Sequence, residues 1–355
     1  MKKGHRSTIA LAMAALLAGA VAGQSQANAA EPAPRPAALA PVDVATNLSI
    51  PWNAAFLPDG TTLVTERASA RILSISPTGQ VTVVQQLLQD VAPRGEGGLL
   101  GMAVSPTYQT DGLVYIYYTT ATDNRISRLR LGERPQPILT GIPAGNIHNG
   151  GRIAFGPDGF LYAGTGDAGQ TANAQNRNSL GGKILRMTAA GAPAPNNPVP
   201  GSRLYSLGHR NVQGFAWDST GRMYASEFGQ NTWDEFNRIQ AGANYGWPVV
   251  EGRGTDPRFT NPLVTWTTAQ ASPSGIAIRG NNAYVACLRG QKVFRIALGV
   301  DGGVVGQPEA LFNGQFGRLR QVTTAPDGSL VVLTSNRDGR GTPRPGDDRV
   351  VRLDI

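Results

Sequence analysis

Cysteine, histidine and charged residues are all scarce in this chain of 355 residues. It contains one cysteine, Cys287, and three histidines. A single cysteine excludes an intramolecular disulfide and a cysteine-based metal cluster. Charged residues make up 16% of the chain and hydrophobic residues 41%, which excludes a disordered charged tail and predicts a globular protein with a large core. Because no basic stripe with interleaved aromatic residues occurs, nucleic acid is not an expected partner.

The first 29 residues have the pattern of a secretory signal peptide. Lys2, Lys3 and Arg6 precede an apolar run at residues 9–23, and small residues end the segment at Ala29. The run is short, rich in Ala and Gly, and lacks the basic cluster that follows a stop-transfer helix, so we do not expect stable membrane insertion. We predict a secreted or periplasmic protein after cleavage.

The rest of the chain divides into a short leader and one long folded region. Residues 30–41 are rich in Pro and Ala and predict an extended leader. Residues 42–355 contain 6 copies of one phrase, in which an apolar strand, a turn often formed by Pro-Asp-Gly, and a second strand follow one another. The copies are WNAAFLPDGTTLVTE (52–66), LGMAVSPTYQTDGLVYIYY (100–118), GRIAFGPDGFLYAGTGD (151–167), QGFAWDSTGRMYASEFG (213–229), SGIAIRGNNAYVACLRG (274–290) and RQVTTAPDGSLVVLTSN (320–336).

This repeat predicts an all-β, six-bladed β-propeller that forms a single domain over residues 42–355. A β-sandwich or two stacked barrels would also contain short strands and turns. Neither would repeat the same strand-turn-strand phrase 6 times, so the propeller is favoured. Propellers bind ligands at one end of the central channel, and candidate functional residues do flank the repeated phrases.

His148 is the first candidate for catalysis. It lies just before the third copy of the repeat, where a loop leads into an innermost strand, and a neutral imidazole there could accept a hydroxyl proton. Asp167 ends the hairpin of the same copy and could orient the imidazole. A lone histidine is more often a packing residue, so the pattern alone leaves both interpretations open.

Arginines form the second candidate group. Arg210 with Asn211, Arg289, and Arg318 with Arg320 begin or end different copies of the repeat, and they are therefore expected at the same end of the channel. Arginines that converge repel one another unless an anion lies between them, and their paired donors match carboxylates. The more specific interpretation is that these arginines bind a polycarboxylate ligand. The alternative is that they are solvated arginines at the blade edges.

The segment at residues 225–248 offers carboxylates and glycine-rich backbone carbonyls. These hard oxygen ligands suit Ca²⁺, although the segment lacks the spacing of an EF-hand.

Several motifs together resemble a known family. LGHRNVQGFAW, SEFGQNTWDEFN, GANYGWP, RGEGGLLGMAVSP and IHNGGRIAFGPDG occur here in the order typical of the soluble sugar dehydrogenases that depend on pyrroloquinoline quinone (PQQ), the glucose/sorbosone dehydrogenase family. The resemblance begins near Pro51 and is most specific at residues 207–248. It implies a six-bladed propeller that binds PQQ, a tricyclic quinone with three carboxylates, next to Ca²⁺.

The resemblance also implies a role for each candidate residue. His148 would be the general base for the anomeric hydroxyl, with Asp167 beside it. Arg210 and Asn211 would contact the cofactor near its reacting carbonyl. The remaining implied contacts are Arg289, Arg318 and Arg320 to the cofactor carboxylates, the carbonyls of Gly229 and Gln230 to a catalytic Ca²⁺, and Glu235 and Tyr245 to part of a structural Ca²⁺ site.

Four positions depart from the family pattern. Glu96 stands where the family commonly has a glutamine that touches the cofactor, so it must be protonated or turned towards Ca²⁺ or an arginine. Ile147 replaces the acidic residue of glucose-oxidising members, so a preference for glucose is not carried over from the family, and the expected substrates are aldoses in general. Arg289 replaces a lysine, and Gln230 replaces a proline whose carbonyl alone is needed.

We therefore expect an enzyme that oxidises the C1 hydroxyl of aldose sugars to lactones and passes electrons to an acceptor that the sequence does not identify. Two alternatives remain at this stage, a calcium-dependent propeller lactonase and a non-catalytic sugar-binding propeller. The protein is expected to be a monomer or a homodimer.

Overall fold

The structure, a computed structural model, describes residues 1, 40–353 and 355. Apart from Met1, the predicted signal peptide at residues 1–29 lies outside the described residues, as does most of the predicted leader at residues 30–41. No helix in the part of the chain that the structure describes has both the length and the apolar character needed to cross a membrane.

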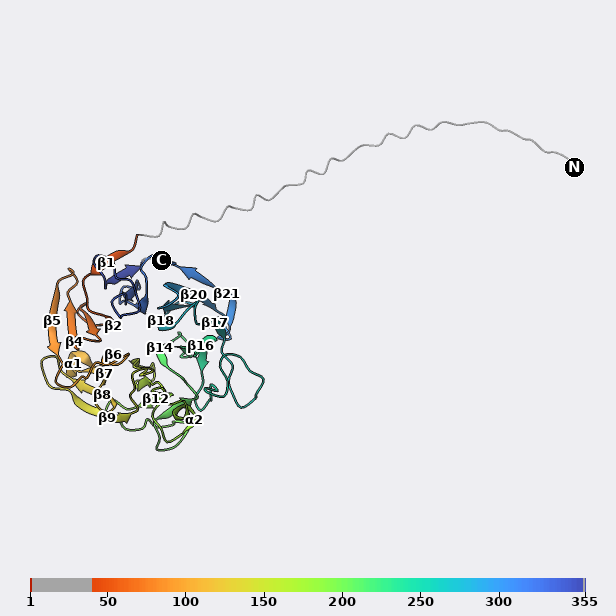
Figure 1. Cartoon of the computed structure of the whole chain (residues 1–355), viewed down its shortest axis with the longest axis horizontal. Coiled ribbons are helices and arrows are strands. Elements are labelled where there is room, and N and C mark those ends of the chain that lie inside the picture. The colour runs from red at the N-terminus through yellow and green to blue at the C-terminus, as the bar shows by residue number, and fades with distance from the viewer. Residues whose placement is uncertain (2–39, 354) are drawn as a thin grey trace, which may run out of the picture. The chain divides into compact units, whose positions relative to one another are not determined.

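Six antiparallel sheets of four strands each form a ring (Figure 1). The predicted all-β, six-bladed β-propeller is thus confirmed, and each of the 6 repeated phrases forms the two inner strands of one blade. The first three blades are blade 1, with β2 (Pro51–Phe56), β3 (Thr62–Glu66), β4 (Arg71–Ile75) and β5 (Val81–Gln86); blade 2, with β6 (Leu99–Val104), β7 (Val114–Thr119), β8 (Asn124–Leu129) and β9 (Gln136–Ile142); and blade 3, with β10 (Ile153–Phe155), β11 (Leu161–Gly164), β12 (Lys183–Met187) and β13 (Leu204–Leu207).

The second half of the ring follows the same order, except that its last blade takes a strand from the beginning of the domain. The strands are blade 4, with β14 (Val212–Trp217), β15 (Met223–Glu227), β16 (Trp233–Ile239) and β17 (Val264–Thr267); blade 5, with β18 (Pro273–Arg279), β19 (Asn282–Cys287), β20 (Lys292–Leu298) and β21 (Val304–Leu311); and blade 6, with β22 (Leu319–Thr324), β23 (Leu330–Thr334), β24 (Val350–Leu353) and β1 (Val42–Ala45). Because β1 pairs with β24, the two ends of the domain share one sheet and close the ring.

Turn chemistry explains the inner hairpins. In blade 1 the N–H of Gly60 donates to the carbonyl of Leu57 at 3.0 Å, and the Asp59 carboxylate accepts from the N–H of Thr61 at 2.9 Å. Gly60 has a φ of 85°, a conformation that strains residues with a side chain. The Pro-Asp-Gly sequence therefore folds locally into the turn that the repeat predicts.

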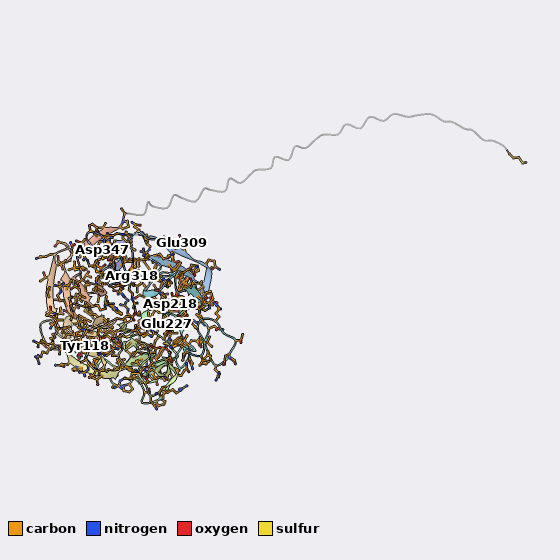
Figure 2. All side chains as sticks on the ribbon, in the orientation of Figure 1. Tyr118, Asp218, Glu227, Glu309, Arg318 and Asp347 are labelled. Atoms are coloured by element: carbon orange, nitrogen blue, oxygen red, sulfur yellow. The ribbon has the colours of Figure 1, made fainter. Side chains whose placement is uncertain are left out.

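The hydrophobic core lies between neighbouring blades. Trp52 of blade 1, Leu100 of blade 2 and Ile153 of blade 3 belong to one buried cluster, and each is at most 2% exposed. Two single-turn helices, α1 (Tyr108–Asp111) and α2 (Ala172–Gln175), are inserted between strands. Figure 2 shows Arg318 and Glu227 near the middle of the ring and Glu309, on an outermost strand, near its rim.

The innermost strands of the blades line the central channel, which has a cavity at each end. The cavity at the carboxyl ends of these strands measures about 300 Å³. Between the two ends the Arg152 guanidinium lies 4.4 Å from the centre of the Trp52 ring, and its Nε donates to the carbonyl of Gln213 at 2.9 Å. The buried Arg152 side chain and its contacts separate the two cavities. The second cavity lies where the innermost strands begin.

Candidate active site

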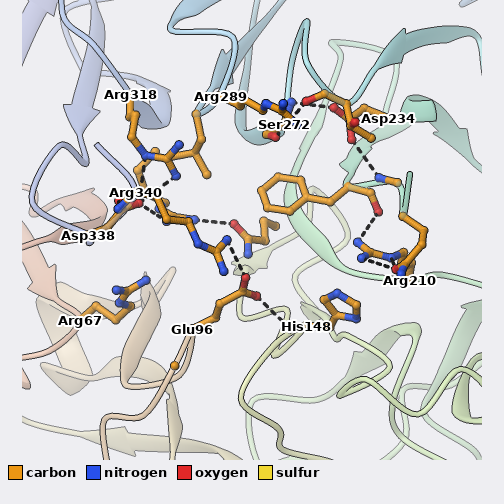
Figure 3. A pocket seen from close by; sticks show the side chains of 18 residues that line it. Arg67, Glu96, His148, Arg210, Asp234, Ser272, Arg289, Arg318, Asp338 and Arg340 are labelled. Carbon is orange, nitrogen blue, oxygen red and sulfur yellow. Dashed lines mark hydrogen bonds and ion pairs between the residues drawn. The ribbon is translucent and has the colours of Figure 1, made fainter. Parts of the chain in front are cut away.

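The larger cavity, of about 450 Å³, lies at the end of the channel where the innermost strands begin (Figure 3). This volume is in the range of small-molecule sites. Its lining combines one histidine, three carboxylates and many cations; the arginines are Arg67, Arg210, Arg289, Arg318, Arg320 and Arg340. We call this cavity the arginine pocket.

His148 and Asp167 form a hydrogen-bonded pair at the edge of the arginine pocket. The Nδ1 atom of His148 lies 2.7 Å from Oδ1 of Asp167, whose side chain is fully buried. A carboxylate at Nδ1 favours the tautomer with the proton on that nitrogen, which leaves Nε2 as an acceptor. His148 lines the pocket and is only 6% exposed. Its imidazole therefore borders the cavity, while the rest of the residue is buried.

The local backbone is shaped to make this pair. His148 adopts a φ of 56°, an uncommon conformation for a residue with a side chain. Gly166, just before Asp167, has no room for a Cβ, because that atom would overlap the carbonyl of His148. The glycine in the sequence Gly-Thr-Gly-Asp thus allows the hairpin to approach the histidine loop closely.

Asp167 is held in its charged form by several donors. The indole Nε1 of Trp247 donates to its Oδ2 at 2.8 Å, and the N–H of Gly169 donates to its Oδ1 at 2.7 Å. Burial raises the pKa of this carboxyl, but the contacts with His148, Trp247 and Gly169 outweigh burial and lower the pKa below its ordinary value. Asp167 is therefore an anion that fixes the orientation of the imidazole.

His209 has a similar acidic partner but a different place. Its Nδ1 lies 2.8 Å from Oε2 of Glu227, its Nε2 lies 2.8 Å from the hydroxyl of Ser206, and it is completely buried. Its ring stacks on Tyr245 with the ring centres 4.8 Å apart. Both ring nitrogens of His209 are therefore occupied, so of the two histidines that the structure describes, His148 is the one available to a ligand.

Glu96 is turned towards an arginine, one of the alternatives expected from its departure from the family pattern. Its Oε1 lies 2.9 Å from Nη1 of Arg340, and its Oε2 accepts a hydrogen bond of 2.9 Å from the backbone N–H of His148. Glu96 lies on the loop before β6, whereas Arg340 lies between β23 and β24. The carboxylate therefore links blade 6 to the loop that carries the histidine.

Asp338 pairs with two of the predicted arginines. Its Oδ2 lies 2.9 Å from Nη2 of Arg318 and 3.7 Å from Nη2 of Arg320. Burial raises the pKa of Asp338, but the two guanidinium charges outweigh this and lower it. Burial also lowers the pKa of Arg320 to about 9. Arg289, which also lines the pocket, is exposed at its margin.

Arg210 contacts the loop that carries the predicted metal ligands. Its Nε and Nη2 donate to Oε1 of Gln230 at 2.9 and 2.6 Å, and its Nη1 donates to the carbonyl of Phe228 at 3.1 Å. Asn211, the next residue, is buried and does not line the pocket. Its Oδ1 accepts the N–H of Gly150 at 2.9 Å, while its Nδ2 is buried and has no hydrogen-bond partner among the described residues.

Gly229 and Gln230 lie on a turn that fits a hard cation through its backbone. Glu251 Oε1 accepts the N–H groups of four consecutive residues, Gln230 to Trp233, at 2.8 to 3.0 Å. No backbone hydrogen bond to the carbonyl oxygen of Gly229 or Gln230 is found among the described residues. Both residues line the arginine pocket, so these carbonyls are available as ligands for Ca²⁺.

Glu235 and Tyr245 border a different, much smaller cavity of about 10 Å³, close to the space that one water or ion occupies. Burial, reinforced by the nearby charge of Glu227, raises the pKa of Glu235 to about 8. The two neighbouring buried carboxylates repel each other, and a cation bound beside them would lower this pKa. Within the described residues, no cluster of three or more His, Cys, Asp or Glu side chains could hold a metal ion, so a site here would need backbone oxygens.

Sequence reasoning missed Arg67, Asp338 and Arg340. Arg67 directly follows β3, and Asp338 and Arg340 follow β23, the second strands of their blades. Asp167 and Arg289 occupy comparable positions in blades 3 and 5. The repeat itself thus contained the signal, because the residues after each second strand reach the same end of the channel.

The comparison with known protein families identifies this architecture. The sequence profile described as Glucose / Sorbosone dehydrogenase matches residues 48–343. The chain belongs to the glucose/sorbosone dehydrogenase family. The resemblance noted from the sequence motifs is therefore confirmed.

Relatives with assigned activities support this membership. The chain is 32% identical to quinoprotein glucose dehydrogenase B of Acinetobacter calcoaceticus over 61% of this chain and 54% of that protein. It is 27% identical to the aldose sugar dehydrogenase YliI of Escherichia coli over 82% and 89% of the two chains. The PQQ-bound aldose sugar dehydrogenase of Streptomyces coelicolor has a similar structure, with 51% identity, a TM-score of 0.85, and coverage of 88% of this chain and 96% of that one.

Proposed function

We propose that this protein is a PQQ- and calcium-dependent dehydrogenase that oxidises the C1 hydroxyl of aldose sugars to lactones. The observation that carries the proposal is the His148–Asp167 pair facing a pocket lined by six arginines. This combination provides a base for a hydroxyl proton and cations for a polycarboxylate. The relative from Streptomyces coelicolor binds PQQ and supports the choice of cofactor.

His148 is the general base of this proposal. Its Nε2 accepts the proton of the C1 hydroxyl, while Asp167 holds the ring through Nδ1 and stabilises the positive charge that develops. Arg210, fixed by Gln230 and Phe228, would supply a positive charge to the bound cofactor. When bound, PQQ supplies the acceptor for the C1 hydride. Loss of this hydride and of the hydroxyl proton converts the sugar to its lactone.

The carbonyls of Gly229 and Gln230 are the ligands proposed for a catalytic Ca²⁺, and Glu235 with Tyr245 contributes to a structural one. Ca²⁺ at the first position would supply a Lewis acid next to the cofactor. Arg318 and Arg320, oriented by Asp338, would bind cofactor carboxylates, with Arg289 at the margin and Asn211 behind the histidine loop.

Ile147 and the N-terminal segment refine the proposal. Ile147 is 41% exposed and places no carboxylate beside His148, which supports a broad aldose range. The signal-peptide pattern at residues 1–29 supports a secreted or periplasmic location. The two electrons removed from the sugar pass to an acceptor outside the chain, and the enzyme acts as a monomer or homodimer.

Reconstitution tests this function. The purified protein is stripped with chelator, supplied with PQQ and Ca²⁺ separately and together, and assayed with several aldoses and a dye as electron acceptor. We expect turnover only with both additions, and a large loss in His148→Ala. Dye reduction without PQQ, or lactone hydrolysis in its place, would contradict the proposal.

A further inference from the structure

Arg67 has a buried side chain for which the described part of the chain provides no partner. It is 9% exposed and lines the arginine pocket. Among the residues that the structure describes, its guanidinium makes no hydrogen bond and no ion pair. Figure 3 shows it beside Glu96, across the pocket from Arg210, with no dashed line reaching it. A buried polar group that lacks a partner costs free energy, and a charged one costs more.

The position of Arg67 is built into the fold. Its N–H donates to the carbonyl of Ile50, and its own carbonyl accepts the N–H of Leu99, both at 3.0 Å. Gly98 makes room for its stem, because a Cβ at Gly98 would overlap the Arg67 carbonyl and lie 3.0 Å from the Arg67 Cγ. The φ of 141° at Gly98 also favours glycine. Hydrogen bonds to its N–H and to its carbonyl therefore fix the Arg67 backbone at the pocket wall.

The nearest opposite charges are already engaged. Asp338 and Glu96 attract the Arg67 guanidinium, but Asp338 is paired with Arg318, and Glu96 is paired with Arg340. Burial outweighs their attraction and lowers the pKa of Arg67, and the like charges of Arg318 and Arg340 add to this effect.

The whole pocket likewise has fewer negative than positive side chains. Six arginines line it against the three carboxylates of Glu96, Asp234 and Asp338, an excess of three positive charges when all are ionised. This excess, to which a Ca²⁺ bound by Gly229 and Gln230 would add, favours an anionic ligand, and PQQ has three carboxylates. Arg318 and Arg320 share Asp338, whereas no carboxylate of the described residues pairs with Arg67.

We propose that Arg67 binds a carboxylate of PQQ and is a further cofactor-binding residue of the arginine pocket. This inference rests on the proposed function. Arg67 is pre-positioned in the free protein, and its lack of a partner there is relieved when the cofactor binds. Its contribution is therefore to affinity for the anionic cofactor and not to proton transfer.

Equilibrium binding of PQQ tests the proposal. Quenching of tryptophan fluorescence by PQQ is titrated in Ca²⁺ buffer for the full chain, for Arg67→Gln and Arg67→Lys, and for Arg130→Gln, a control at an exposed arginine outside the pocket. We expect about 10- to 100-fold weaker binding for Arg67→Gln, partial recovery in Arg67→Lys, and no change in the control.

The melting temperature without cofactor provides an independent readout. Removal of an unpaired buried charge should leave the free Arg67→Gln protein as stable as the wild type or more stable, whereas loss of a structural arginine would lower its Tm. Equal PQQ affinity in Arg67→Gln and wild type, with or without a lowered Tm, would overturn the inference about Arg67 but not the proposed function. A wild-type protein that binds no PQQ refutes the proposed function and the inference with it.

A competing ligand is examined in parallel. Glucuronate carries one carboxylate on a sugar, and it is titrated against the free protein by the shift in Tm. We expect no stabilisation that depends on Arg67. Saturable stabilisation by glucuronate that disappears in Arg67→Gln would place Arg67 in the sugar site and overturn its assignment to the cofactor.

Discussion

Glu96 and Arg340 form an ion pair of 2.9 Å at the arginine pocket, although one residue precedes blade 2 and the other belongs to blade 6. The Arg340 side chain is 61% exposed and that of Glu96 16% exposed. Ion pairs with such an exposed partner contribute little, about 0 to 1 kcal/mol. The hydrogen bond from the His148 N–H to Glu96 is therefore the more important contact for the loop that carries His148.

Kinetics of variants at this pair should separate its two contacts. Glu96→Gln keeps an acceptor for the His148 N–H, so we expect Glu96→Gln and Arg340→Gln each to change kcat/KM by less than about 5-fold. Glu96→Ala leaves the N–H without its acceptor and should lower kcat by about 10-fold or more. A loss in Arg340→Gln as large as in Glu96→Ala would show that the ion pair positions the histidine.

Asp167→Asn should affect the chemical step and leave sugar binding nearly unchanged. The amide keeps the size of the carboxylate but cannot stabilise a protonated imidazole, so we expect kcat to fall about 10²- to 10⁴-fold with a small change in KM. Steady-state kinetics of the reconstituted enzyme measures both values. Asp301→Asn, at an exposed turn, is the matched control. A loss confined to KM would contradict the role of Asp167 as a positioning residue.

The Asp338 carboxylate should make stability depend on acid pH. Its folded pKa is lowered below the ordinary value of 3.8, so its stabilising effect is complete above that value and is lost as the pH falls through the folded pKa. Asp338→Asn should lower the free energy of unfolding by about 3 kcal/mol at pH 7. The difference from wild type should shrink below about pH 4.

Urea unfolding from pH 7 to pH 3 measures this difference. Asp301→Asn again serves as the control and should differ little from wild type at every pH. If the difference between wild type and Asp338→Asn stayed constant down to pH 3, the pairing with Arg318 and Arg320 would not be the source of the stability.

Calcium should stabilise the protein in the absence of cofactor. An ion that binds only the folded state at 100 times its Kd adds about 2.7 kcal/mol, so Ca²⁺ should raise the Tm of the chelator-stripped protein by several degrees. Glu235→Gln should lose part of this shift, while Glu309→Gln, at an exposed carboxylate, should keep all of it. An equal shift in Glu235→Gln would place the ion away from the small cavity.

The architecture and half of the pocket could be predicted because their signals are local. The Pro-Asp-Gly turns specify hairpins within a few residues, and their repetition indicates the ring. His148 and Asp167 flank the same repeat copy, so their proximity also followed from the pattern. The repeat places Asp338 and Arg340 at the correct end of the channel, but it does not show which partners they have, because the contact between Arg340 and Glu96 joins residues that are far apart in the sequence.

The sequence also could not reveal which arginines carry a partner. Arg318 and Arg67 are both buried pocket arginines at the edge of a strand, yet Asp338 pairs with Arg318 and, within residues 40–353, no carboxylate pairs with Arg67. This difference depends on side-chain packing between blades 1 and 6. Composition and motif spacing do not specify how these side chains pack against one another.

The pairing of β1 with β24 has a consequence for how the protein is made. Blade 6 needs Val42–Ala45 from the start of the domain and Val350–Leu353 from its end, so a ribosome must synthesise the chain through β24 before that sheet can assemble. Until then β1 has no neighbour, and the ring stays open. A polypeptide interrupted before β24 would therefore expose sheet edges to other nascent chains, which makes premature termination an aggregation hazard for this protein.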